Sequence, residues 1–267
     1  NIPIGNAVYT MEAWMLARTQ VSNGNGNGIV GWGNYGTNNQ VNAFKYQNNS
    51  LGNYWWGNDL SVVVGNITGK WHHVACSFDG TTRKIYLDGV LIGSDTPTGH
   101  NVPNANNFRV GLTISTISLF NSNFDGSLDE VRVWNVARTQ AQIQAAMYGT
   151  ISPSTTGLVA YYSFNTGTPG GTNTGLTTLS DHTANNNAGT LTNFALTGAT
   201  SNWVESYAMV IPTATAATNV AATSFTANWT APAVGTVTNY LLDVSTASNF
   251  SSLVSGYNGL VVSGLSQ

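Results

Sequence analysis

The sequence predicts an all-β sandwich, and two observations lead to that prediction. Short apolar runs follow one another through residues 1–135, separated by turn residues at the regular spacing typical of sandwiches. Within Gly69–Gly93, apolar and polar positions alternate across three runs, so one face of each run is expected to be buried. Asp79-Gly80 and Asp88-Gly89 separate these runs and supply the positive-φ residues that tight hairpins need, which predicts two consecutive hairpins.

The expected elements follow from the same alternation. The predicted strands, in chain order, are Val8–Leu16, Ile29–Gly33, Gln40–Tyr46, Gly52–Trp56, Leu60–Val64, Trp71–Phe78, Lys84–Leu87, Val90–Ile92, Phe108–Leu112 and Ser127–Asn135. One helix is expected over Thr139–Met147, because Thr139 is a good N-cap residue and Gly149 follows as a stop. The positions expected to form one continuous core are Trp14, Val74, Cys76, Phe78, Ile85, Leu87, Val131 and Val133.

Composition limits the classes of partner. Charged residues make up 7% of the 267 residues, the formal net charge is −3, and all eight Lys and Arg lie between Arg18 and Arg138. This pattern offers no basic patch for phosphates and argues against nucleic acid. No apolar run approaches the roughly 20 residues that a membrane span needs. The single Cys76 excludes an internal disulfide and is expected to be a small core residue.

The composition also bears on location. Solubility must come from Asn, Thr, Ser and Gly, a composition that suits secreted β-proteins. The sequence begins at Asn1 without a Met or a signal peptide and stops in mid-pattern. We therefore expect a fragment of a longer secreted or cell-surface protein whose sorting signals lie outside it.

Three motifs carry a family resemblance: WHHVA at residues 71–75, IYLDG at residues 85–89 and LDEVRVWNVARTQAQI at residues 128–143. They resemble the laminin-G-like domains of the concanavalin A-like jelly-roll superfamily. The resemblance implies a jelly-roll domain over residues 1–150, with the short helix packed against the sandwich edge. It also implies binding of sugars or surfaces rather than chemistry.

The remainder of the chain divides into two parts. Residues 151–210 resemble the opening segment of a laminin-G-like domain, and they either complete the same sandwich or form an adaptor. Completion is favoured, because Val159, Tyr161 and Phe164 alternate as a half-buried strand would. Residues 211–267, with Trp229 and the alternating run Tyr240–Val244, resemble an incomplete fibronectin type III domain.

The densest acidic cluster is Asn123–Glu130. It resembles the laminin-G-like closing motif and not the catalytic strand of the related glucanases. Asp129 and Glu130 are adjacent on an expected strand and point to opposite faces, so they cannot act as a pair on one substrate. We therefore expect no catalytic residues and no enzyme activity.

A calcium site is the second interpretation of the acidic residues. Many laminin-G-like and pentraxin-like domains hold calcium at one rim, which needs six to eight oxygen ligands. The resemblance implies candidates in Asp125, Asp129 and Asp181, the last with Asn185–Asn187. The stretch Gly111–Asn121, which corresponds to the acid-rich loop of the pentraxin site, has no acid. The alternative is that Asp125 makes the turn and Asp129 caps backbone amides.

Aromatic residues concentrate between residues 32 and 56, and sugars stack their C–H faces on such rings. The candidate carbohydrate-binding residues are Trp32, Tyr35, Tyr54, Trp55 and Trp56. The same stretch supplies amide side chains that can read hydroxyl groups, namely Asn34, Asn38, Asn39, Gln40, Asn42, Gln47, Asn48 and Asn58. Tyr54 and Trp56 would share one face of a strand and Trp55 the other, and one of those faces must be core. The rings are therefore either packed inside or part of a sugar platform.

The function expected first is a non-catalytic adhesion or carbohydrate-binding module that recognises a glycan or surface ligand. Strings of such domains resemble very large modular proteins of bacterial surfaces, including adhesins exported by the type IX secretion machinery. Two alternatives stay open: a carbohydrate-binding appendage of a polysaccharide-degrading enzyme, and a structural spacer in a stalk. Fold alone does not separate them.

Overall fold

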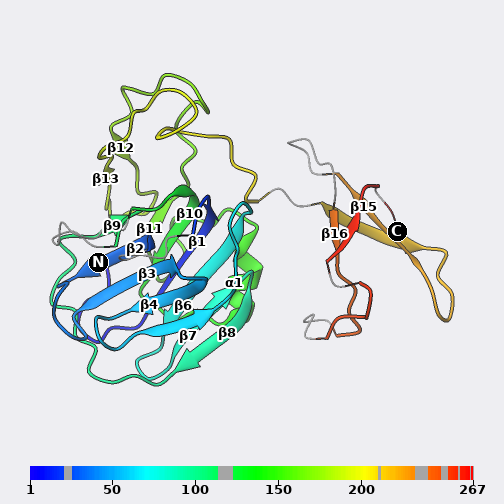
Figure 1. Cartoon of the computed structure of the whole chain (residues 1–267), viewed down its shortest axis with the longest axis horizontal. Helices are drawn as coiled ribbons and strands as arrows, with labels where there is room; N and C mark the ends of the chain where they lie inside the picture. Colours follow the sequence, from blue (N-terminus) through cyan, green and yellow to red (C-terminus); the bar gives the residue numbers. More distant parts are fainter. Residues whose placement is uncertain are drawn as a thin grey trace. The chain divides into compact units, whose positions relative to one another are not determined.

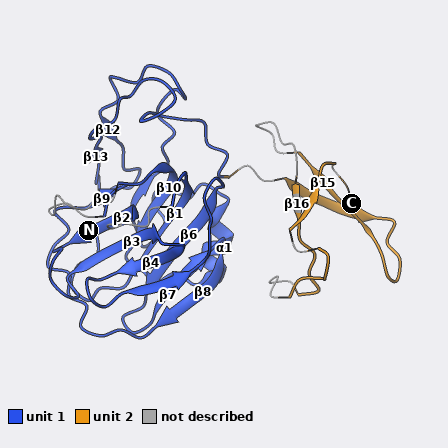
Figure 2. Ribbon diagram, in the orientation of Figure 1, with its two compact units in different colours: residues 1–208 blue, residues 209–267 orange. Residues whose placement is uncertain are grey.

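Two antiparallel sheets face each other in Asn1–Ala208, the first of two structural units (Figures 1 and 2). The computed structural model describes residues 1–20, 26–113, 123–209, 212–231, 240–247, 252–257, 259–264 and 266. One sheet has six strands in the order β11-β10-β1-β6-β7-β8, and the other has five in the order β5-β4-β3-β2-β9. Within the described residues an all-β sandwich with one short helix is confirmed.

The observed strands lie close to the expected ones. Those of the six-stranded sheet are β1 (Tyr9–Ala17), β6 (His72–Phe78), β7 (Arg83–Leu87), β8 (Val90–Asp95), β10 (Gly126–Trp134) and β11 (Leu158–Tyr162). Those of the five-stranded sheet are β2 (Asn27–Gly33), β3 (Val41–Gln47), β4 (Ser50–Tyr54), β5 (Leu60–Val63) and β9 (Arg109–Val110). The two predicted hairpins are β6–β7 and β7–β8. At the second of them Asp88 and Gly89 both have positive φ, as a tight hairpin turn requires.

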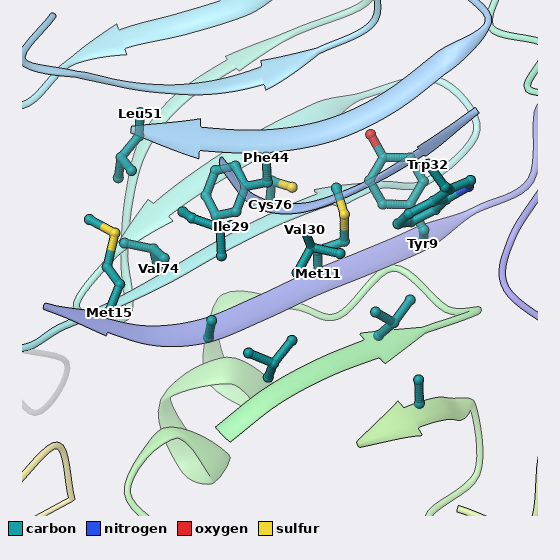
Figure 3. Close-up of a cluster of buried hydrophobic side chains, with 14 of the residues drawn as sticks. Tyr9, Met11, Met15, Ile29, Val30, Trp32, Phe44, Leu51, Val74 and Cys76 are labelled. Atoms are coloured by element: carbon teal, nitrogen blue, oxygen red, sulfur yellow. The ribbon is translucent and has the colours of Figure 1, made fainter. Parts of the chain in front are cut away.

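Side chains from both sheets fill the space between them (Figure 3). The residues labelled in that view are Tyr9, Met11, Met15, Ile29, Val30, Trp32, Phe44, Leu51, Val74 and Cys76. Of the eight expected core residues, six lie in this cluster, namely Val74, Cys76, Phe78, Ile85, Val131 and Val133, and Leu87 packs against it. Period-two alternation therefore assigned most of the eight expected residues to the core correctly.

Trp14 is the exception, and its assignment to the sandwich core was wrong. Its neighbours Ala13 and Met15 face the sandwich, so Trp14 points to the other side of the six-stranded sheet. There the indole N–H donates a 2.7 Å hydrogen bond to the carbonyl of Met147. The helix covers this outer face, so both faces of β1 are buried and alternation alone cannot assign an apolar residue to one of them.

The helix α1 (Gln140–Met147) begins with the predicted cap. The Thr139 hydroxyl accepts the backbone N–H of Gln142, and the Gln142 side chain accepts the N–H of Thr139, which forms a capping box. Ile143 packs with Ala75 and Tyr86, so the helix lies on the outer face of the six-stranded sheet.

Arg132, which forms a buried ion pair, also binds the end of α1. Arg132 donates to the carbonyls of Ala146 and Gly149, just past the last helical turn. The same guanidinium pairs with Glu130 at 2.5 Å. Burying a charge is costly unless it is paired, so this network is consistent with a structural anchor for the helix.

The segment after the helix adds a strand to the sandwich. β11 pairs antiparallel with β10, and the first structural unit runs from Asn1 to Ala208. All five residues of β11 are buried. The pairing is that of a sandwich-completing strand, the first of the two explanations for residues 151–210. Two short strands, β12 (Thr178–Leu179) and β13 (Gly189–Thr190), pair within the same segment.

A loop covers the free edge of β11. The carboxylate of Asp181 accepts the N–H of Tyr161, and the Tyr161 carbonyl accepts the N–H of His182. The carbonyl of Val159 accepts from the side-chain amides of Asn185 and Asn187 at 3.0 and 2.9 Å. Side chains of the loop and the backbone N–H of His182 therefore make the hydrogen bonds that a further strand would make.

The described residues of the second unit, Met209–Gln267, form two antiparallel ribbons. They are β14 (Thr213–Thr218) with β15 (Thr226–Thr230), and β16 (Tyr240–Leu242) with β17 (Leu260–Val262). Trp229 is buried and packs edge-on against Tyr240, with ring centroids 5.5 Å apart. In the described parts of the chain, no helix is long and apolar enough to cross a membrane.

Candidate functional site

The outer face of the five-stranded sheet has small residues along its middle. One row across β4, β3, β2 and β9 consists of residues paired in register: Tyr54, Ala43, Gly31 and Arg109. Phe44, next to Ala43, lies in the core, so the row points away from the sandwich interior. Ala43 and Gly31 therefore form a low floor between two larger side chains.

A hollow of about 90 Å³ lies beside this row on the same face. Its lining residues come from β3, β4, β5 and the β3–β4 turn, and they are Lys45, Gln47, Asn48, Ser50, Gly52 and Ser61. Gly52 is paired with Lys45 on one side and Ser61 on the other. A Cβ atom at Gly52 would meet only ordinary contacts, the nearest being the Leu60 carbonyl at 3.7 Å. The absence of a side chain there keeps the hollow open.

Tyr54 and Lys45 stand together at the junction of the row and the hollow. The Lys45 ammonium lies 4.3 Å from the centroid of the Tyr54 ring, a cation–π contact. Both side chains are half-buried, and this burial raises the pKa of Tyr54 and lowers the pKa of Lys45. The Trp56 ring lies 5.7 Å from that of Tyr54 at a steep angle, so a second half-buried ring lies beside Tyr54.

Tyr35 reaches over the floor of the row from the loop after β2. Its hydroxyl lies 2.5 Å from the point that a Cβ atom of Gly31 would occupy. Gly31 therefore makes room for the Tyr35 side chain on the outer face. The ring is half-buried, and burial raises the pKa of its hydroxyl, an effect that the charge of Arg109 partly offsets.

Residues 1–144, more than half of the chain, match a known family, described as the concanavalin A-like lectin/glucanases superfamily. The chain belongs to this superfamily.

Three comparisons find proteins similar to this concanavalin A-like domain at low identity. A solved structure of a candidate carbohydrate-binding protein from Bacteroides ovatus matches with a TM-score of 0.56 and 24% identity, over 71% of this chain and 54% of that one. The CBM40 module of a Ruminococcus gnavus sialidase, bound to α2,3-sialyllactose, matches with a TM-score of 0.44 and 14% identity, over 52% and 82%. Mouse pappalysin-1 is 27% identical over 81 residues, which are 30% of this chain and 5% of that protein. The chain thus spans about half of the Bacteroides protein and a small part of pappalysin-1.

Two of the five predicted sugar-binding aromatics of the concanavalin A-like domain were assigned wrongly. Trp32 and Trp55 are fully buried in the core. Trp32 alternates with Gly31 on β2 and donates its indole N–H to the Pro3 carbonyl at 2.8 Å. The Trp55 ring lies between the His100 ring and the Arg83 guanidinium, with centroid distances of 3.7 and 4.2 Å. Both rings therefore stabilise the sandwich and cannot meet a ligand on its surface.

The other three predicted aromatics are half-buried: Tyr54 contacts Lys45 at the edge of the hollow, Trp56 packs against Tyr54, and Tyr35 lies over Gly31 in the neighbouring row. Strand β4 ends at Tyr54 and not at Trp56, which has φ of 65° in the following turn. The predicted sharing of one face by Tyr54 and Trp56 holds nevertheless, because the turn brings the two rings together.

Sequence reasoning did not identify most of the lining of the hollow. Gln47 and Asn48 were among the expected amide groups, but Lys45, Gly52 and Ser61 were not among the candidates. The signal was present in the run VNAFKYQ, where Lys45 and Gln47 alternate with the buried Phe44 and Tyr46. Ser61 has no such local signal, because its place in the hollow depends on the pairing of β4 with β5.

The three candidate calcium ligands of the concanavalin A-like domain each bind protein groups. Asp125 pairs with Arg18 at 2.7 Å and accepts the Thr19 hydroxyl. Asp129 accepts the Ser206 hydroxyl at 2.5 Å and the N–H of Glu130. Asp181 accepts three backbone N–H groups, that of Tyr161 in β11 and those of Thr183 and Asn187 in the loop that covers this strand.

Across the described residues, no group of three His, Cys, Asp or Glu side chains comes together to hold a metal ion. Calcium binding by Asp125, Asp129 and Asp181 therefore stays a prediction. Part of the stretch Gly111–Asn121 lies outside the described residues.

The side chains of Asp129 and Glu130 bind different residues. Asp129 bonds to Ser206, while Glu130 accepts from Arg132 and from the Tyr161 hydroxyl. Glu130 has φ of 50° at an irregularity in the pairing of β10 with β1. Both carboxyl groups are nearly inaccessible, so neither is positioned to meet a substrate.

Proposed function

We propose that this concanavalin A-like domain is a non-catalytic carbohydrate-binding module. The glycan lies on the outer face of the five-stranded sheet, over the hollow beside Tyr54. The observation that carries the proposal is the half-buried Tyr54 ring, which borders a hollow lined by amide, hydroxyl and ammonium groups.

This combination suits a sugar. An aromatic ring offers a flat apolar surface for C–H groups, while Gln and Asn side chains both donate and accept hydrogen bonds. Gln47, Asn48, Ser50 and Ser61 supply such groups on one side of Tyr54. The low floor at Gly52 leaves room for part of a ring.

The same face lacks the pattern of a glycosidase. Glycoside hydrolysis generally requires a pair of carboxyl groups about 5–9.5 Å apart on either side of the scissile bond. The hollow and the Tyr54–Arg109 row consist of amide, hydroxyl, aromatic, basic and small residues. This arrangement binds without supplying an acid or a nucleophile.

The setting of the domain forms part of the proposal. We infer a module of a large secreted bacterial surface protein, of the adhesin type, that type IX secretion machinery would export. The two ribbons of residues 209–267 would then begin a fibronectin type III module, with Trp229 and Tyr240 in its core. The structural likeness to a candidate carbohydrate-binding protein supports the glycan ligand. A binding appendage of a polysaccharide-degrading enzyme is compatible with the same face.

The test fills the hollow and leaves the fold intact. The full chain, Gly52→Leu and Gly175→Leu are compared on a glycan array. Gly52 tolerates a Cβ atom, and a Cβ at the exposed Gly175 meets nothing within 4 Å, so the second variant controls for the added Leu. We expect Gly52→Leu to lose glycan binding and Gly175→Leu to retain it. Binding unchanged in Gly52→Leu would place the site elsewhere, and no binding by the wild type would favour a spacer.

A further inference from the structure

The basic residues of this chain differ in whether a carboxylate neutralises them. Every Asp and Glu of the sequence lies in the described residues, so the comparison covers all carboxylate side chains. Five of the eight Lys and Arg pair with one within 4.0 Å, namely Arg18, Arg83, Lys84, Arg132 and Arg138. Among the described residues the other three, Lys45, Lys70 and Arg109, make no such pair.

Two of these three unpaired cations lie on the proposed sugar-binding face. Lys45 lines the hollow, and Arg109 ends the Tyr54 row. Two strand spacings and two residues along the strand separate them, so their Cα atoms are about 12 Å apart. Arg109 is exposed and acts electrostatically on Tyr35, the ring that covers the floor between them.

Lys45 is the more unusual of the two, because it is half-buried without a counter-ion. Its ammonium contacts the face of Tyr54, and burial lowers its pKa. The negative charge of Asp59 raises the pKa of Lys45 slightly, but the Asp59 carboxylate lies beyond ion-pair distance of the ammonium. Its Oδ1 instead accepts the backbone N–H of Trp55 at 2.8 Å. A partly desolvated cation is costly unless an anion approaches it.

We propose that the glycan bound here is acidic, and that Lys45 and Arg109 bind carboxylate or sulfate groups on it while Tyr54 stacks on a sugar ring. This inference rests on the proposed function and specifies its ligand class. The spacing of the two cations exceeds one sugar ring, so a chain with repeated acidic groups reaches both. Charge-assisted hydrogen bonds to such groups are stronger than the neutral ones that hydroxyls make.

The experiment uses two matched pairs of polysaccharides with the full chain. Polygalacturonate is compared with its methyl ester, which keeps the backbone and removes the carboxylate charge, and dextran sulfate is compared with dextran. Affinity is measured by isothermal titration calorimetry at low and high NaCl concentrations. The pair that shows discrimination identifies the carboxylate or the sulfate as the group recognised.

Three variants and a control assign the effect to residues. Lys45→Met keeps the side-chain stem against Tyr54 and removes the charge, and Arg109→Gln removes the other cation. Tyr54→Ala removes the stacking ring, and Lys70→Met removes an exposed, unpaired cation that is not on this face. Melting temperatures are measured for all four variants to show that each is folded.

We expect the wild type to bind the acidic member of one pair at least about tenfold more tightly than the neutral member. Lys45→Met and Arg109→Gln should each weaken that binding by about tenfold, and Lys70→Met should leave it unchanged. If neutral glycans bind as well as acidic ones and only Tyr54→Ala weakens them, the acidic ligand is refuted while the carbohydrate-binding function stands. If no glycan binds to the wild type, both are refuted.

Discussion

Trp55 and Tyr54 are neighbours in the chain but lie on opposite faces of the five-stranded sheet, and replacing each with Ala separates stability from binding. Trp55 is fully buried between His100 and Arg83, and its indole N–H donates to the Tyr9 hydroxyl at 3.1 Å. Truncation of a buried Trp generally costs roughly 3–5 kcal/mol. Arg83 keeps its two hydrogen bonds to Asp95, so no unpaired buried charge adds to that cost.

For a unit of this size, the loss in Trp55→Ala corresponds to a fall in melting temperature of roughly 6–20 °C. Tyr54→Ala removes a half-buried ring and should lower the free energy of unfolding by less than about 1 kcal/mol. It should weaken glycan binding by about thirtyfold, the effect of losing an anchor worth about 2 kcal/mol.

The assay measures thermal unfolding and glycan affinity on the same preparations of both variants. The reasoning is refuted if Tyr54→Ala destabilises the protein as much as Trp55→Ala does. It is also refuted if Tyr54→Ala is fully stable and binds glycan as tightly as the wild type.

Three further predictions concern stability. Deleting residues 151–208 should cost more than about 5 kcal/mol, because it removes the five buried residues of β11; an unchanged urea midpoint would contradict the pairing with β10. Burial lowers the pKa of His100 to about 4 from 6.5, so the unfolded state takes up a proton first as the pH falls. The contribution of His100 to stability should then fall by about 1.5 kcal/mol between pH 6.5 and 5, and His100→Gln should lose less over that range in urea titrations. Calcium at the Asp125–Asp129 rim would make EDTA lower the melting temperature, and Asp129→Asn would abolish that response; a melting curve indifferent to EDTA would exclude a stabilising ion.

Local patterns were sufficient for most of the fold. The two hairpins of residues 69–93 follow from alternation and two Asp-Gly turns, and the N-cap of α1 follows from Thr139. These features depend on residues a few positions apart, so the sequence displays them directly.

The errors arose where a face is covered by a distant segment. Trp14 fits the apolar alternation of its strand, but α1 covers the outer face of that strand, so an apolar residue there is buried outside the sandwich core. Trp32 and Trp55 have the composition of a sugar platform, yet only the packing of the two sheets shows that they point inward. The hollow needs residues of β3, β4 and β5 in one register, which no short run of sequence specifies.

The loop over β11 has a consequence for how copies of this protein behave when crowded. An edge strand with free N–H and C=O groups can recruit a strand from another molecule and start edge-to-edge aggregation. Here Tyr161 and Val159 are already bonded to the 181–187 loop, so the six-stranded sheet is closed to such growth at this border. Copies of the domain that meet at this border therefore contact one another through the loop and not by strand pairing.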